Sequence, residues 1–238
     1  MINAIFIQSF YDEIRDGRLQ KLINNIFLNL NKKNIKVIIF LDSLSSTLEE
    51  LINFPDESNI SIIYIVEDGI INPTSKIFQF MMNYEVEKYK RILLLESDCV
   101  IKKDFDVLIN EGLENLKNPE WYIYGSQYYG LEPWMNIDSE QGKFRKKHMN
   151  GVAVYNRSKS FINLINNLFV SENLINNEVN YDFAIHFLIK DLNIYNKMID
   201  SELILNISRL CDMKLRHENI KSKCAIVHTK NKNYSFDQ

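Results

Sequence analysis

The segment Arg91-Ile92-Leu93-Leu94-Leu95-Glu96-Ser97-Asp98-Cys99-Val100 runs from four apolar residues directly into two carboxylates. Such an apolar run, bounded by polar residues, is typical of a strand buried on both faces of a parallel sheet. Apolar residues also follow Glu96 and Asp98, which places both carboxylates near the end of a central strand. An unpaired charge is costly there, and a bound Mn²⁺ or Mg²⁺ would offset that cost and leave positions open for a diphosphate. The alternative is a strand-end turn that exposes two acids to water.

Short apolar segments alternate with longer amphipathic ones on both sides of this segment. We expect further strands at 4–9, 35–41, 60–66, 121–125, 152–155, 194–199 and 224–228. Helical spacing of apolar residues predicts helices at 19–30, 44–54, 75–88, 104–116, 158–169 and 181–190. A polar and aromatic segment at 128–145 is too long for a simple connection and is typical of a functional loop. Strands alternating with helices indicate an α/β fold, with a parallel sheet covered on both faces.

The composition is that of an ordinary globular protein. The chain has 238 residues, 46% of them hydrophobic and 25% charged, and a formal net charge of −3 at pH 7. One domain is the expectation at this length. A chain so balanced in charge is not a nucleic-acid binder by bulk electrostatics, because phosphate contacts need concentrated positive charge.

The sequence shows no signal for membrane insertion or secretion. No apolar run approaches the ~20 residues that span a bilayer. The opening residues lack the basic region and cleavage site of a secretory signal. The three cysteines, Cys99, Cys211 and Cys224, form no CxxC pair, which argues against a disulfide framework or a cysteine zinc site. We therefore expect a cytoplasmic protein, in the host cytoplasm if the source is a virus.

Polar side chains recur where the expected strands end. In an open parallel sheet, ligands bind beyond the carboxyl ends of the strands. The candidates at these ends include Gln8, Ser9 and Phe10 after the first strand and Asp42 after the second. The acids at this edge are explained either as solvated carboxylates or as ligands of a divalent cation that bridges protein and phosphate.

Four segments, in this order along the chain, resemble the motifs of the GT-A glycosyltransferases, which use nucleotide-sugar donors and carry a DxD motif. They are Glu96-Ser97-Asp98, His148-Met149-Asn150-Gly151-Val152-Ala153-Val154-Tyr155-Asn156-Arg157-Ser158, Asn180-Tyr181-Asp182-Phe183 and Cys224-Ala225-Ile226-Val227-His228-Thr229-Lys230. The resemblance extends over most of the chain, roughly residues 2 to 230. It implies a GT-A, Rossmann-like domain spanning 1–238, with a mostly parallel central sheet and a smaller acceptor-side subregion. Residues 1–100 would hold the nucleotide and residues 101–238 the acceptor.

The resemblance also implies a metal site. Asp98 would be the principal ligand, because the last acid of the motif is the more regular ligand in that family. His228 would complete the site, and Glu96 would join it or contact the ribose or a metal-bound water. Here Glu96 stands where the motif has Asp. Each residue also has a plain structural interpretation, as a turn carboxylate or a polar strand end.

A sugar nucleotide, with a UDP-sugar favoured, is the donor that the resemblance implies, and a glycan or other hydroxyl compound is the acceptor. The expected nucleotide- and donor-binding residues are Gln8, Ser9, Phe10, Asp42, Lys76, Glu96, Ser97, Asn150, Gly151 and Lys230. Lys76 stands at the start of an expected helix, whose positive end would favour a diphosphate. Its alternative is a solvated lysine in a first helical turn.

An inverting transfer needs a base that takes the proton of the acceptor hydroxyl. Asp182 is the first candidate, and Asp138 and Glu140 in the long loop are the alternatives. A retaining enzyme would need no such base. Asp182 also has a structural interpretation, because an acid is favoured in the first turn of a helix.

Two other functions stay open at this point. A module that binds a nucleotide sugar but lost turnover would explain Glu96 in place of Asp. A HAD-like phosphatase would explain an apolar strand ending in Asp42, but that class needs a second acid where this chain has Leu44. We rank the phosphatase lower.

Overall fold

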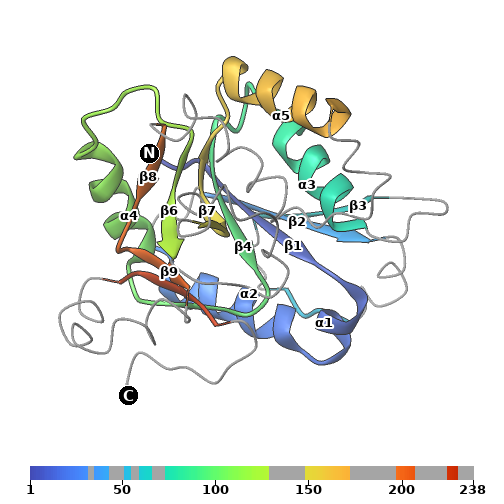
Figure 1. Cartoon of the computed structure of the whole chain (residues 1–238). Helices are drawn as coiled ribbons and strands as arrows, with labels where there is room; N and C mark the ends of the chain where they lie inside the picture. The colour runs from blue at the N-terminus through green and yellow to red at the C-terminus, as the bar shows by residue number, and fades with distance from the viewer. Residues whose placement is uncertain are drawn as a thin grey trace, which may run out of the picture.

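Within the described residues, the apolar runs of the sequence form the strands of a seven-stranded sheet (Figure 1). A computed structural model describes residues 1–31, 35–42, 51–54, 59–65, 73–128, 148–171, 197–206 and 224–229. The strands of the sheet are β1 (Ala4–Ser9), β2 (Lys36–Asp42), β3 (Ile60–Ile65), β4 (Arg91–Glu96), β6 (Ile123–Tyr128), β7 (His148–Asn156) and β8 (Met198–Asp200). Their spatial order is β3-β2-β1-β4-β7-β6-β8.

The sheet is parallel except at β7. Strands β3, β2, β1 and β4 run parallel to one another, and β8 runs parallel to β6. Strand β7 lies between β4 and β6 and is antiparallel to both. The carboxyl ends of β1 to β4 therefore meet at one edge, and the beginning of β7 lies at that same edge.

Helices cover both faces of the sheet because the side chains of each strand alternate between them. On β1, Ala4 and Phe6 belong to one buried core, and Ile5 and Ile7 belong to the other. The first core packs against α3 (Pro73–Asn83) and α5 (Lys159–Ser171). The second packs against α1 (Tyr11–Arg15), α2 (Arg18–Asn29) and α4 (Phe105–Glu114). Figure 1 shows these helix layers on opposite sides of β1 and β4.

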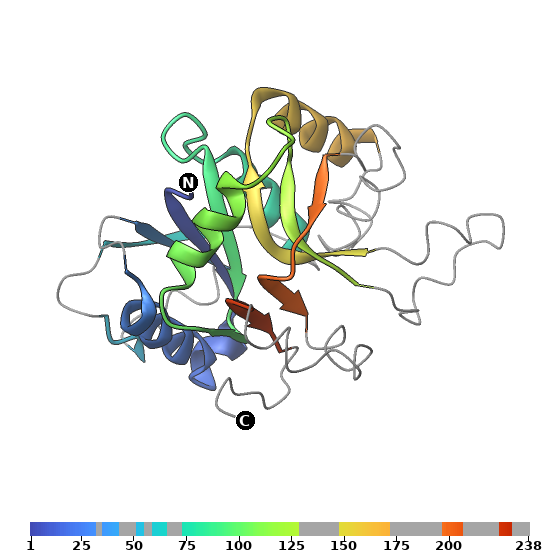
Figure 2. The same cartoon turned by 90° about the vertical axis from the view of Figure 1, so that its left-hand side faces the viewer.

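A small second sheet lies beside the end of β4 (Figure 2). It consists of three-residue strands in the order β5 (Cys99–Ile101), β10 (Ile226–His228) and β9 (Ile204–Asn206). Strand β5 follows β4 after a turn made by Ser97 and Asp98. The sequence predicts only β10 among these strands, because three residues are too few for a recognisable alternation of apolar and polar positions.

Most expected elements are present with shifted ends. The strand expected at 152–155 is longer in the structure, where it forms β7. The sequence does not predict helix α1 or strands β5 and β9. The expected helices at 44–54 and 181–190 lie wholly or largely outside the described residues. Within the described part of the chain, no helix combines the length and apolar character that crossing a bilayer requires. Cys99 and Cys224 are buried and form no disulfide.

Helix α3 ends five residues earlier than its sequence pattern predicts, and Arg157 marks the end. The Arg157 side chain is 1% exposed, and its guanidinium donates to the carbonyls of Met81 and Tyr84 at 2.8 Å each. It donates further to the carbonyl of Tyr89. Burial lowers the pKa of Arg157 to about 10. The cation thus satisfies carbonyls that the helix end leaves without an intrahelical donor.

We predict that Arg157→Met lowers the free energy of unfolding by about 3 kcal/mol, because several buried carbonyls lose their donors together. Urea unfolding followed by circular dichroism measures the change. Arg15→Met is the matched control, because Arg15 is 66% exposed and pairs with an exposed Asp12. Its effect should stay within about 0.5 kcal/mol. Equal effects of the two substitutions would contradict a capping role for Arg157.

Candidate metal-binding site at the carboxyl end of β4

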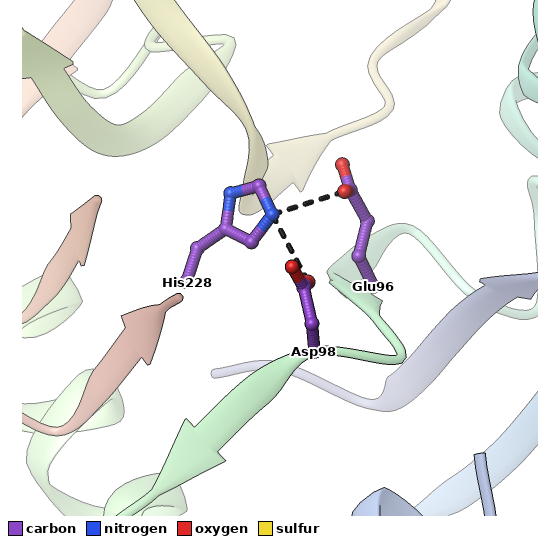
Figure 3. Close-up of side chains that lie close together, drawn as sticks. All are labelled: Glu96, Asp98 and His228. Carbon is purple, nitrogen blue, oxygen red and sulfur yellow. Dashed lines mark ion pairs between the residues drawn. The ribbon is translucent and has the colours of Figure 1, made fainter. Parts of the chain in front are cut away.

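Three side chains converge at the end of β4 (Figure 3). Glu96 is the last residue of β4, Asp98 lies in the turn that follows, and His228 is the last residue of β10. The Nε2 atom of His228 lies 3.1 Å from Oε2 of Glu96 and 3.1 Å from Oδ1 of Asp98. One ligand atom from each of the three residues lies within 4.8 Å of the others.

The pairing of β5 with β10 brings His228 to the two acids. The strands are antiparallel, and His228 stands opposite Cys99. Beyond this pair, the backbone N–H and the hydroxyl of Thr229 both donate to the carbonyl of Asp98, at 3.2 Å and 2.6 Å. These two bonds join positions 131 residues apart in the sequence. They fix the turn that carries Asp98 against the strand that carries His228.

The site is partly buried and strongly charged. His228 is 4% exposed, and the side chains of Asp98 and Glu96 are 10% and 26% exposed. Burial alone would lower the pKa of His228, but the charge of Glu96 and hydrogen bonds to both carboxylates raise it to about 10. A protonated His228 therefore forms ion pairs with both acids through Nε2 in the metal-free chain.

The arrangement fits a divalent cation. Carboxylate and imidazole donors are ligands that such ions take in proteins. At metal–ligand distances of about 2.1–2.2 Å, neighbouring donors in octahedral coordination stand about 3.0–3.1 Å apart. The 3.1 Å spacings from His228 to Glu96 and Asp98 match this value. The three residues could hold a metal ion in place of the His228 proton.

The described residues that were expected to hold the donor lie at the same edge of the sheet as this site. Gln8 is buried on β1 and stands beside Glu96 in the parallel pairing of β1 with β4. Ser9 is fully buried, and the half-buried Phe10 packs against the core under α3 and α5. Ser97 is buried in the turn between the two acids.

Other expected donor residues share the same edge of the sheet. Asp42 ends β2, and Lys76 lies in the first turn of α3, where it is half-buried. Asn150 and Gly151 lie near the beginning of β7, which the antiparallel pairing places at the carboxyl end of β4. Their positions agree with a donor site at this edge without testing their roles.

The residues expected to act on the acceptor are not among those described. Asp138, Glu140 and Asp182 lie outside the described residues, and so does Lys230. Their assignments stay predictions.

Glu13 is a residue of this region that the sequence analysis did not assign. It lies on α1, directly after β1, and its side chain is 17% exposed. Its Oε2 accepts hydrogen bonds from the Ser9 hydroxyl at 2.9 Å and from the Phe10 N–H at 3.0 Å. An acid three residues after a helix N-cap is a recognisable local signal for the second of these bonds.

Three solved structures with this fold illustrate what the chain is similar to. The galactosyltransferase LgtC, in complex with donor and acceptor sugar analogues, aligns with a TM-score of 0.61 and 14% identity over 94% of this chain and 86% of its own. Mouse xyloside xylosyltransferase 1 aligns with a TM-score of 0.54 and 11% identity over 96% of this chain and 97% of its own. The glycosyltransferase GlyE of Streptococcus pneumoniae TIGR4 aligns with a TM-score of 0.51 and 13% identity over 99% of this chain and 56% of its own.

Sequence comparison adds no relative to these structures. No protein-family model and no curated protein matches the chain. The architecture alone makes the connection: the chain has the GT-A fold of the glycosyltransferases, as the order of its motifs implied.

We predict that His228 makes the stability of the metal-free chain depend on pH. Its pKa is raised from an ordinary 6.5 to about 10. The stabilisation is therefore fully present below pH 6.5 and is lost as the pH rises toward 10. The free energy of unfolding of the native chain should exceed that of His228→Gln by up to about 4 kcal/mol at pH 6.

Urea unfolding in the presence of EDTA, from pH 6 to pH 10, measures this difference. Comparison with His228→Gln removes the contributions of other groups that titrate in the same range. The two curves should converge as the pH rises. Curves that stay parallel over the whole range would contradict the charged bridge.

Proposed function

We propose that this chain is a metal-dependent glycosyltransferase, which moves a sugar from a nucleoside-diphosphate sugar to a glycan or another hydroxyl acceptor. The observation that carries the proposal is the Glu96–Asp98–His228 cluster at the carboxyl end of a central strand in a GT-A fold. Ligands of open α/β sheets bind at this edge. The solved structures of similar fold are named as galactosyl- and xylosyltransferases.

The metal would be Mn²⁺ or Mg²⁺, with Asp98, His228 and Glu96 as its protein ligands. Carboxylates suit either ion, and the imidazole of His228 favours Mn²⁺ over Mg²⁺. When bound, the cation would neutralise the negative charge that develops on the leaving diphosphate. His228 must give up its Nε2 proton to become a ligand, so metal binding and proton release are coupled at this site.

The nucleotide would lie along the carboxyl ends of β1, β2 and β4, with a UDP-sugar as the favoured donor. Gln8 and Ser9 would hold the nucleoside, and Phe10 offers an aromatic face for stacking on the base. Lys76, at the N-terminal end of α3, would favour the diphosphate through its charge and the helix dipole. This division assigns the nucleotide to residues 1–100.

The acceptor would then bind within residues 101–238. Asp182, or else Asp138 or Glu140, would accept the proton of the attacking hydroxyl in an inverting transfer. Asn150, Gly151 and Lys230 would complete the donor pocket from this half of the chain. No observation favours a HAD-like phosphatase, because the fold is that of the GT-A proteins.

We predict that a nucleoside diphosphate raises the melting temperature only when Mn²⁺ is present, since ligand binding to the native state stabilises it by mass action. Thermal-shift measurements with UDP, GDP, CDP and dTDP, with and without Mn²⁺, identify the donor class. Asp98→Asn should abolish the shift. Glu114→Gln, which removes an exposed acid of α4, is the control that should retain it.

Turnover separates an enzyme from a binding module of the same fold. The sugar nucleotide that matches the stabilising diphosphate should be hydrolysed slowly in the presence of Mn²⁺, and Asp98→Asn should lower this rate at least 100-fold. Stabilisation without turnover would favour the binding module. Folded protein that shows no shift with any nucleotide would overturn the proposal.

A further inference from the structure

Glu13 keeps a nearly buried carboxylate on α1, directly after β1. Besides the Ser9 and Phe10 donors, the Arg18 guanidinium lies 3.6 Å from Oε1 of Glu13. Burial raises the pKa of the Glu13 carboxyl, while the hydrogen bonds and the charge of Arg18 act in the opposite direction. Burying a carboxylate is costly unless it is hydrogen-bonded or paired. The Ser9 and Phe10 donors and the Arg18 guanidinium offset that cost here.

The hydroxyl of Ser97 is another group that interacts with this carboxylate. Its interaction with Glu13 favours the charged form of the acid. Ser97 is 4% exposed, and its Oγ makes no hydrogen bond within 3.5 Å in this conformation. A small rotation would let the hydroxyl donate to Glu13, which has acceptor capacity left after its bonds to Ser9 and Phe10.

Strand alternation explains why Ser9 and Ser97 share a partner. Ile7 on β1 and Leu95 on β4 belong to the core that packs against α1 and α2. Ser9 follows Ile7 by two positions on β1 and faces the same side of the sheet. Ser97 begins the turn beside it, because Gln8 stands opposite Glu96 in the pairing of β1 with β4. Glu96 follows Leu94 by two positions, faces the other side of the sheet and pairs with His228. Glu13 therefore interacts with the Glu96–Asp98 turn through Ser97, the residue between the two acids.

We propose that Glu13 is a positioning residue that joins the nucleoside end of β1 to the metal-binding turn. By accepting from Ser9 and Phe10 and interacting with the Ser97 hydroxyl, its carboxylate holds the ends of β1 and β4 in one arrangement, so that Glu96 and Asp98 present their oxygens to a single cation. The part that concerns the nucleotide rests on the proposed function. The part that concerns the metal requires only the observed cluster.

A purely structural role for Glu13 predicts something different. If Glu13 only caps the short helix α1, its loss lowers stability by an amount typical of a cap and leaves the metal site unchanged. If Glu13 positions the turn, its loss weakens metal binding in protein that is still fully folded. Outer-shell partners of metal ligands typically contribute 10–100-fold to metal affinity. Metal affinity is thus the readout that distinguishes the two roles.

The experiment is calorimetric titration of Mn²⁺ alone into the folded protein, without nucleotide. The variants are Glu13→Gln, Ser97→Ala and their combination, with Asp98→Asn as the reference that removes the site. Asp12→Asn is the matched control, because it removes the neighbouring acid of α1, whose side chain is 72% exposed. Circular dichroism at the titration temperature verifies that each variant is folded.

Glu13→Gln should weaken Mn²⁺ binding about 10-fold, and Asp12→Asn should change it by less than about twofold. Ser97→Ala should add little once Glu13 is replaced, because the two residues act through one contact. Native affinity in Glu13→Gln, with binding lost in Asp98→Asn, would overturn this inference and leave the proposed function standing. Independent, multiplicative effects of the two substitutions would overturn it as well. Native protein that binds no Mn²⁺ would overturn both.

Discussion

His228 reaches Glu96 and Asp98 because two three-residue strands, β5 and β10, pair in a single register. Two carboxylates and an imidazole cannot share a buried volume without a positive charge among them, since unpaired buried charges are costly. In the metal-free chain a proton on His228 supplies that charge, with Nε2 at 3.1 Å from each acid. The bonds from Thr229 to the Asp98 carbonyl keep the register in place. The 3.1 Å distances between Nε2 of His228 and the two carboxylates also fit the spacing of ligand atoms around a divalent cation.

The residues at the ends of the central strands β1 and β4 interact with different partners on the two faces of the sheet. Glu96 continues the row of β4 side chains that packs under α3 and α5, and it meets His228. Ser9 and Ser97 continue the opposite row and lie toward α1, where Glu13 offers a carboxylate. The end of β4 and its turn thus carry both the metal-site acids and a residue that interacts with the end of β1.

The sequence predicts those parts of the fold that depend on local patterns. The apolar runs of β1 and β4 and the acids after β4 are visible in any window of ten residues, and the family resemblance supplied His228. Strands β5 and β9 were missed, because their three residues carry no periodicity and form only through pairing with β10. Helix α3 ends earlier than its pattern predicts, and Arg157, far along the chain, donates to the carbonyls of Met81 and Tyr84 at this end. Glu13 gave a local capping signal, but its relation to Ser97 exists only after β1 and β4 pair.

The most direct test is an anomalous difference map from a crystal of the protein soaked in Mn²⁺. The account predicts one strong peak within coordination distance of Glu96, Asp98 and His228, with His228 no longer hydrogen-bonded to the acids. A map without a peak at this position, in which the Nε2 atom of His228 still bridges the two carboxylates, would contradict the assignment of these residues as a metal site.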